Sequence, residues 1–173
     1  MKFLVLTDIH GSIKYLNIAI EKYSKLNCEK ILLLGDILYH GPRNNLPDGY
    51  QPKEVITLLN SYKDKILCVK GNCDAEVDEM VLEFPLYPIV MINVGGAKLE
   101  LVHGHNLDEC ECEGYILHGH THVNKYEDGI INIGSLSIPK DEHHTYAVIE
   151  DGVLTSYDLF TDEVLMSVKL WKK

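Results

Sequence analysis

The sequence predicts an α/β protein whose first half forms a parallel sheet and whose second half is mostly antiparallel. In the first half, three short apolar runs alternate with stretches in which apolar residues recur at helical spacing, which is the βαβ pattern. In the second half, Gly-Gly and Asp-Gly pairs separate several apolar runs, as hairpin turns require. Each of the first three runs also ends in residues of a metal-ligand type, where open α/β sheets place their sites.

The expected elements follow from these runs. In the first half we expect strands over residues 2–6, 31–34 and 66–69 and helices over residues 12–26 and 55–59, with Ser12 as a helix cap. In the second half we expect strands over residues 89–94, 98–102, 130–133, 146–149, 153–159 and 164–170. No repeat or low-complexity linker interrupts the chain, so residues 1–173 are expected to form a single domain.

Composition and charge exclude several classes of protein. With 46% hydrophobic and 24% charged residues, the chain has the balance of a globular protein rather than a disordered one. A formal net charge of −10 argues against binding to the phosphate backbone of nucleic acids, and we expect no sequence-specific nucleic-acid partner. A small phosphate ester stays compatible with this charge, because bound divalent cations reverse the local sign.

The N-terminus and the cysteines indicate a cytoplasmic protein. The apolar run 3–6 is far too short for a signal peptide or a membrane span, so we expect no membrane association. The five cysteines are Cys28, Cys68, Cys73, Cys110 and Cys112. Their odd number and their lack of a framework favour free thiols in a reducing compartment.

Residues of metal-ligand type follow the apolar runs throughout the chain. They are Asp8, His10, Asp36, Asn72, His103, His120 and His122. The last two belong to the stretch 118–122, which has histidines at alternate positions; on a strand, alternate residues share one side. Oxygen and imidazole ligands in this number can supply two metal sites if one carboxylate bridges them, and paired metals are a known device for phosphoryl hydrolysis.

This set resembles the signature of the calcineurin-like metallophosphoesterase superfamily, which reads D-x-H, G-D, G-N, a lone His and G-H-x-H. The sequence matches it at every ligand position, and the resemblance extends over nearly the whole chain. Features shared with small bacterial and archaeal phosphodiesterases of the YfcE type are residues 36–44, 71–74, 134–135 and 137–140. The resemblance implies a four-layer αββα sandwich of two mixed sheets flanked by helices.

The resemblance also implies a role for each ligand. Asp8, His10 and His122 would hold one metal, Asn72, His103 and His120 would hold the other, and Asp36 would bridge them. A hydroxide shared by both metals would attack phosphorus in line. Mixed nitrogen and oxygen ligands suit transition metals, so we expect two divalent ions per chain, with Mn²⁺ first and Ni²⁺, Co²⁺, Fe²⁺ or Zn²⁺ as alternatives.

Substrate contacts are less well marked in the sequence. Many members of the superfamily carry His after the Gly-Asn pair, but this chain has Cys73, as the YfcE-type subgroup does. His105 is therefore our candidate for contact with the phosphoryl group or the leaving oxygen, and the expected catalytic set is Asp36, Asn72 and His105. His40 and Arg43 are expected at the rim of the site together with Cys73.

Two other residues are expected to play supporting roles. Asp74 directly precedes a stretch that looks helical, which favours a helix cap or a support for the ligands. His118 lies outside the G-H-x-H match and is expected to be structural.

The preferred hypothesis is a metal-dependent phosphodiesterase that acts on a small phosphodiester. A phosphomonoesterase or a nuclease on the same site is the second hypothesis, since the sequence does not reveal the leaving-group pocket. A third is a protein-binding scaffold, because the superfamily includes a retromer scaffold subunit, although such proteins often lose part of the ligand set. Related small phosphodiesterases often self-associate, so a homo-oligomer is also expected.

Overall fold

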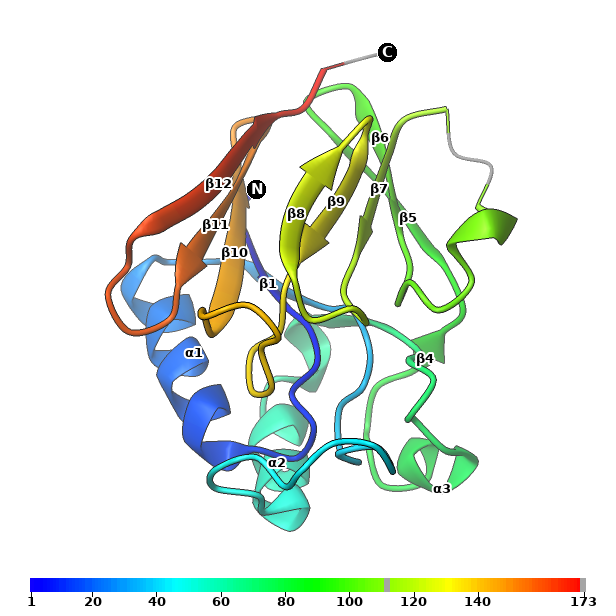
Figure 1. Ribbon diagram of the computed structural model, residues 1–173, viewed down its shortest axis with the longest axis vertical. Helices are drawn as coiled ribbons and strands as arrows, with labels where there is room; N and C mark the ends of the chain where they lie inside the picture. The colour runs from blue at the N-terminus through cyan, green and yellow to red at the C-terminus, as the bar shows by residue number, and fades with distance from the viewer. Residues whose placement is uncertain (111–112, 172–173) are drawn as a thin grey trace.

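Two mixed β-sheets pack face to face in the computed structural model, which describes residues 1–110 and 113–171 (Figure 1). In spatial order, the seven-stranded sheet comprises β12 (Val164–Lys169), β11 (Val153–Asp158), β10 (Thr145–Glu150), β1 (Phe3–Leu6), β2 (Lys30–Leu33), β3 (Ile66–Val69) and β4 (Leu86–Tyr87). The five-stranded sheet comprises β5 (Val90–Val94), β6 (Ala97–Leu101), β7 (Tyr115–His118), β9 (Ile130–Ile133) and β8 (Asn124–Glu127).

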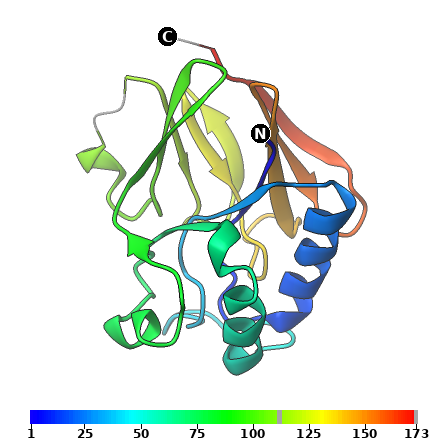
Figure 2. The same ribbon diagram turned by 180° about the vertical axis from the view of Figure 1, so that it is seen from behind.

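Helices cover mainly one of the two sheets. The helices α1 (Ile13–Lys25) and α2 (Pro52–Asn60) lie side by side against the seven-stranded sheet, as Figure 2 shows from behind. Ser12 caps α1, because its hydroxyl accepts a hydrogen bond from the backbone N–H of Tyr15. The other described helices are single turns, namely η1 (Lys63–Lys65), α3 (Glu76–Glu79) and η2 (Leu107–Glu109). None of these turns forms a layer comparable with α1 and α2.

The strand pairing follows the sequence pattern in the first half and departs from it in part of the second. The strands β1, β2 and β3 are parallel, as the βαβ pattern predicts. The second half is mostly antiparallel, as expected, and β10 also pairs antiparallel with β1, which joins both halves of the chain in one sheet. However, β7 runs parallel to both β6 and β9. A long loop returns the chain from the end of β6 to the start of β7, and β8 returns it from the end of β7 to the start of β9.

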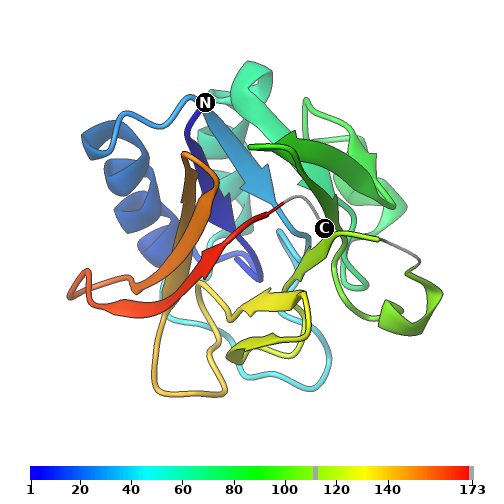
Figure 3. The same cartoon turned by 90° about the horizontal axis from the view of Figure 1, so that it is seen from above.

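The core has two layers because the central strands are buried on both faces. Leu4 and Leu6 of β1 pack with the helices, whereas Phe3 and Val5 face the five-stranded sheet. Figure 3 shows this arrangement from above, with α1 on one side of the orange and red strands and the β8–β9 hairpin on the other. Full burial of an aliphatic side chain contributes about 1.5–3 kcal/mol, so one layer holds the helices on the seven-stranded sheet and the other holds the two sheets together.

The direction of the strands places several chain ends together. The parallel strands β1, β2 and β3 all point their carboxyl ends away from the N-terminus, toward the end of the molecule where α3 lies (Figure 1). The loops after β6 and β7 reach the same end. Among the described residues, none of the helices combines the length and apolar character that crossing a membrane requires.

Candidate metal centre

The loops that follow β1, β2, β3, β6 and β7 bring all seven predicted ligands into one region. Five of them have a left-handed backbone, with φ of 53° at Asp8, 46° at His10, 56° at Asp36, 66° at His120 and 62° at His122. This conformation is uncommon for residues other than glycine and gathers at functional sites, where the surrounding structure enforces it. Here the N–H of Asp8 donates to the carbonyl of Gly35, and that of His10 donates to the carbonyl of Asp36.

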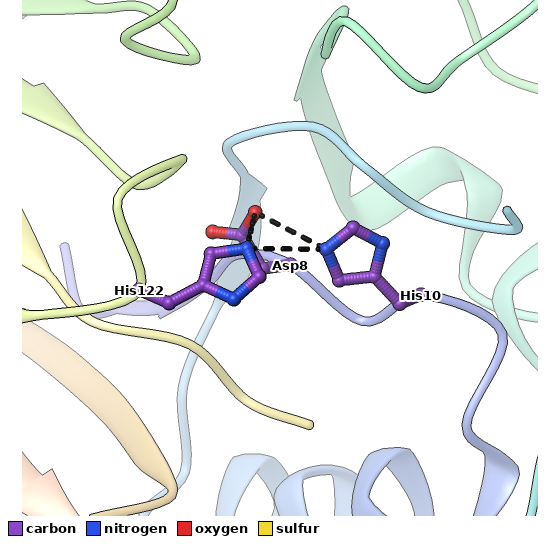
Figure 4. A group of neighbouring side chains, drawn as sticks. All are labelled: Asp8, His10 and His122. Atoms are coloured by element: carbon purple, nitrogen blue, oxygen red, sulfur yellow. Dashed lines mark hydrogen bonds and ion pairs between the residues drawn. The ribbon is translucent and has the colours of Figure 1, made fainter. Parts of the chain in front are cut away.

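Asp8, His10 and His122 form the first ligand cluster (Figure 4). The Nε2 atoms of His10 and His122 lie 3.5 and 3.1 Å from Asp8 Oδ1, and 3.3 Å from one another. Asp8 Oδ1 is buried and has no hydrogen-bond partner among the described residues. A buried carboxylate oxygen without a partner is costly, and two imidazole nitrogens directed at it are the donor set of a transition metal. The residues therefore fit a bound cation.

Backbone carbonyls set the orientation of three of the histidines. The Nδ1 atoms of His10, His103 and His122 lie 2.7, 2.7 and 2.5 Å from the carbonyl oxygens of Tyr39, Leu34 and Ile138, respectively. A carbonyl oxygen only accepts, so each Nδ1 carries the proton and donates it. When such a ring is neutral, its Nε2 has its lone pair toward the site, which is how protein histidines are commonly prepared for a metal.

The second cluster contains Asp36, Asn72, His103 and His120. His103 Nε2 lies 2.9 Å from Asn72 Oδ1, 3.3 Å from Asp36 Oδ2 and 3.2 Å from His120 Nδ1. His120 therefore presents Nδ1 to the site, unlike the other histidines. Asp36 Oδ2 also lies 3.7 Å from His10 Nε2, which belongs to the first cluster. One carboxylate oxygen thus stands between the two clusters.

The electrostatics of both clusters favour added positive charge. Burial acts to raise the pKa of Asp8, but the rings of His10 and His122 outweigh it and the pKa falls below its usual range. Burial acts to lower the pKa of His103, but the Asp36 carboxylate outweighs it and raises this pKa to about 9. Paired charges of this kind mark functional sites more often than the rest of a protein.

Thr7 and Gly119 support the first cluster; Gly119 belongs to the G-H-x-H match, whereas no role was expected for Thr7. The Thr7 hydroxyl donates to Asp8 Oδ2 over 2.7 Å, and the backbone N–H of His120 donates to the same oxygen over 3.0 Å. A Cβ atom on Gly119 would collide with Thr7 Oγ1 and Asp8 Oδ2. The only signal for Thr7 in the sequence is its position next to Asp8, and many unrelated residues stand next to a ligand-type residue.

Two further supports come from the loop after β9. The hydroxyls of Ser135 and Ser137 donate to the backbone carbonyl of Asp8 over 3.2 and 3.0 Å. Both serines are buried. They lie in segments that the family resemblance had marked, but no role was predicted for them.

Asp74 supports the ligands and does not cap a helix. The helix α3 begins at Glu76, with Ala75 at the capping position. The Asp74 carboxylate instead accepts three backbone N–H groups, from Gly71 at 2.7 Å, Ile37 at 2.8 Å and Asp36 at 2.9 Å. Of the two roles expected for Asp74, the structure shows the supporting one, which joins the loops after β2 and β3.

The predicted substrate contacts lie at different distances from the ligands. Arg43 and Cys73 line a cavity of about 330 Å³ beside Asp36, Asn72, His120 and His122, and Lys140 lines it as well. Among the described residues, the lining does not include His40, whose ring packs near the rings of Tyr39 and Tyr50. His105 is exposed beside the second cluster, with its ring centroid 5.6 Å from that of His103.

The stretch 118–122 is not the strand that alternate histidines suggested. The strand β7 ends at His118, and His120 and His122 reach the site through left-handed turns instead. His118 is buried outside both clusters, with Nδ1 3.0 Å from the carbonyl of Gly119, and burial lowers its pKa to about 4. Among the cysteines, Cys112 lies outside the described residues.

Comparison with known proteins decides the family. Residues 1–151 match the calcineurin-like phosphoesterase superfamily domain. The chain belongs to this superfamily. It is 36% identical to the phosphodiesterase YfcE of Escherichia coli K12 over 181 aligned residues, which cover 98% of each chain.

Solved structures agree with this assignment. The structure of YfcE from E. coli, described as a phosphoesterase, superposes with a TM-score of 0.92 at 34% identity and covers 99% of this chain and 100% of that one. Vacuolar protein sorting 29 from Cryptosporidium parvum shares the fold, with a TM-score of 0.63 at 16% identity and 97% of each chain covered. The predicted membership in the YfcE-type metallophosphoesterases and the sandwich of two mixed sheets are confirmed.

Proposed function

We propose that this protein is a metal-dependent phosphodiesterase with two divalent ions at the two ligand clusters. The observation that carries the proposal is the position of Asp36 Oδ2, which lies 3.3 Å from His103 Nε2 and 3.7 Å from His10 Nε2. A carboxylate between two sets of metal-ligand atoms is what a bridged pair of metals needs. The similarity to a named phosphodiesterase over nearly the whole chain supports the same activity.

The residues have separate tasks in this proposal. Asp8, His10 and His122 would hold one ion, Asn72, His103 and His120 the other, and Asp36 both. When bound, the pair would act as a Lewis acid toward phosphoryl oxygens and lower the pKa of water at the site. Arg43 and Lys140 line the neighbouring cavity, so their positive charges are available to a phosphate anion there. His105 stands next to the second cluster, where it can contact a leaving oxygen.

The ligand chemistry favours a transition metal. Four imidazoles take part, and hard ions such as Mg²⁺ and Ca²⁺ prefer oxygen ligands alone. Asp8, Asp36 and Asn72 add oxygen atoms, a mixture that suits Mn²⁺ and is also compatible with Ni²⁺, Co²⁺, Fe²⁺ or Zn²⁺. We therefore place Mn²⁺ first.

The first test is hydrolysis of bis(p-nitrophenyl) phosphate by metal-stripped protein, with each divalent metal added back separately. We expect activity to return with Mn²⁺ or another transition metal and to stay low with Mg²⁺. The same protein should be tested with p-nitrophenyl phosphate and with oligonucleotides, because faster turnover of either would favour a monoesterase or a nuclease. If no metal supports hydrolysis of any of these substrates, the result contradicts the proposal and favours a protein-binding scaffold.

The second test is the substitution Asp36→Asn. The amide keeps the shape of the side chain but removes the charge that would join two cations, so hydrolysis should fall by about 100-fold or more. Asp151→Asn, in the exposed turn between β10 and β11, is the matched control and should keep wild-type activity. If Asp36→Asn folds normally and turns over at the wild-type rate, Asp36 does not bridge metals.

Location and assembly are further parts of the proposal. We infer a cytoplasmic enzyme from the cysteine content, and Cys28, Cys68 and Cys73 are free thiols in the structure. We also expect the protein to self-associate. Light scattering of the purified protein measures this directly, and a monomer at micromolar concentration would contradict it.

A further inference from the structure

An apolar cavity of about 320 Å³ opens beside the second ligand cluster. Pro88, Ile89 and Val102 form its apolar wall, and His103 and His105 line the side toward the metal ligands. Its size falls at the lower end of the roughly 300–1,000 Å³ that small-molecule pockets occupy. The cavity therefore has room for a compact group but not for a macromolecule.

The cavity is continuous with the candidate metal centre. His103 belongs both to the lining and to the second cluster, where its Nε2 lies 2.9 Å from Asn72 Oδ1. His105 extends the lining, with ring centroids 5.6 Å from His103 and 6.1 Å from His120. Gly71 also lines the cavity and lies so close to Asp36 that a Cβ atom would collide with its carboxylate. A group attached to a phosphorus at the centre would reach the cavity directly.

The charges around this cavity differ from those around the other cavity beside the centre. The one charged side chain among the described lining residues, apart from the histidines, is Lys70, and its ammonium is paired with Glu79. Arg43 and Lys140, in contrast, line the cavity of about 330 Å³ next to His120 and His122. The centre thus has one apolar and one cationic cavity as neighbours.

We infer that the apolar cavity binds one of the two ester substituents of the substrate, and that this substituent is a compact apolar group such as an aryl ring. The inference rests on the proposed phosphodiesterase function and specifies its substrate class. A diester on the metal centre carries two substituents, and only one of them faces an apolar surface. The substrate class is therefore an asymmetric phosphodiester with one apolar substituent, and Ile89 contributes to its selection.

Ile89 is the residue that tests the inference most cleanly. It immediately precedes β5 and is 50% exposed, so a polar side chain is accommodated there without loss of core packing. Met91 lies two residues along the same segment, is 54% exposed and is not among the described residues that line the cavity. Ile89→Asn and Met91→Asn therefore form a matched pair that differs in contact with the cavity.

The experiment measures binding of two phosphinates to the metal-loaded protein by calorimetry. Dimethylphosphinate and methyl(phenyl)phosphinate are both monoanions with two oxygens on phosphorus, like a diester, and neither has an ester bond to cleave. Burial of a phenyl group should make the second bind about tenfold tighter or more to the wild type. Ile89→Asn should lower this ratio by about threefold or more and leave dimethylphosphinate unchanged, whereas Met91→Asn should change neither dissociation constant.

The inference is overturned if the wild type binds the two phosphinates with equal affinity, or if it binds neither. It is also overturned if Ile89→Asn leaves the ratio of the two dissociation constants unchanged. Hydrolysis of bis(p-nitrophenyl) phosphate by the same preparations separates this failure from that of the proposed function. Protein that hydrolyses the diester but does not discriminate between the phosphinates has the proposed function without this pocket. Protein that discriminates but does not hydrolyse any diester has the pocket without the proposed function.

Discussion

Thr7 fixes the orientation of the Asp8 carboxylate without offering a ligand itself. Its hydroxyl donates to Asp8 Oδ2, which leaves Oδ1 directed at the imidazoles of His10 and His122. Such supporting hydrogen bonds commonly change metal affinity by about 10- to 100-fold.

Thr7→Val should therefore weaken metal binding at the first cluster by about 10- to 100-fold, with little change in the fold, because valine fills nearly the same space. The measurement is the concentration of Mn²⁺ that restores half of the hydrolysis to metal-stripped protein. Thr155→Val on β11, where the hydroxyl lies 3.4 Å from that of Ser167, is the control. An unchanged half-saturation concentration in Thr7→Val would show that the hydroxyl does not tune the site.

The gathering of the ligand-type residues could be predicted at the residue scale, but most of the side chains that support them could not. Asp8 or His103 is recognisable because metal ligands are drawn from few residue types and follow apolar runs. The roles of Ser135 and Ser137 depend on contacts with Asp8, which is more than a hundred residues away in the sequence. Residue type alone does not carry that information.

At the scale of single elements, the turn between β11 and β12 is held by one carboxylate. Asp158 is 8% exposed and accepts from the N–H groups of Phe160 and Thr161 over 2.9 Å each, while His143 lies 3.0 Å away. Burial acts to raise the pKa of Asp158, but these donors outweigh it and lower the pKa to about 2 from an ordinary value of 3.8. The charged form is therefore stabilised by folding.

Asp158→Asn should lower the free energy of unfolding by about 2 kcal/mol at pH 7, since each pKa unit corresponds to about 1.4 kcal/mol. Because the folded-state pKa is lowered, this contribution is fully present above about pH 4 and is lost as the pH falls toward 2. Urea unfolding of wild type and variant across this range measures the difference. Asp128→Asn, in the exposed β8–β9 turn, should differ little from wild type in free energy of unfolding. If the loss of stability in Asp158→Asn does not depend on pH, the lowered pKa of Asp158 is not its cause.

Elements with a clear local pattern were predicted with bounds close to those in the structure. Pairings between strands that are separated in the sequence were not predicted. The strands β3 and β9 have the predicted bounds, and α1 starts after its predicted cap. The parallel pairing of β7 with β6 and β9 and the short strand β4 were not predicted. Parallel pairing is decided by where a crossover returns, and a two-residue strand carries no periodicity.

At the scale of the whole molecule, the candidate metal centre lies where the two sheets meet. Asp8, Asp36 and Asn72 follow strands of the seven-stranded sheet, and His103, His120 and His122 follow strands of the five-stranded one. A metal bound by both groups would link the sheets in the folded state only. The unfolded chain does not hold these residues together, so binding adds to the stability of the fold.

Mn²⁺ should therefore raise the free energy of unfolding of the metal-stripped protein. A site filled at 100 times its dissociation constant contributes about 2.7 kcal/mol. Urea unfolding with and without Mn²⁺ measures the gain, and Asp36→Asn should show a smaller one. If Mn²⁺ leaves the unfolding midpoint of the wild type unchanged, the two groups of residues do not bind a metal together.

The sequence pattern alone indicated less of the architecture than the family resemblance did. The βαβ alternation predicts the parallel strands β1, β2 and β3, but nothing local indicates that β10 joins β1 or that a second sheet packs on the first. The sandwich was expected only because the ligand motifs resemble a known superfamily. Long-range contacts between apolar faces have many alternative partners of similar composition, which single-sequence patterns do not distinguish.

The most direct test of a two-metal centre is a titration of hydrolytic activity with Mn²⁺ at a protein concentration well above the dissociation constants. Metal-stripped wild-type protein and bis(p-nitrophenyl) phosphate are used, and activity is plotted against Mn²⁺ ions added per chain. We predict that activity rises to a break at two ions per chain, as the seven ligands and the shared Asp36 require. A break at one ion per chain, or activity that does not depend on Mn²⁺ or on any other divalent ion, would contradict the two-metal account.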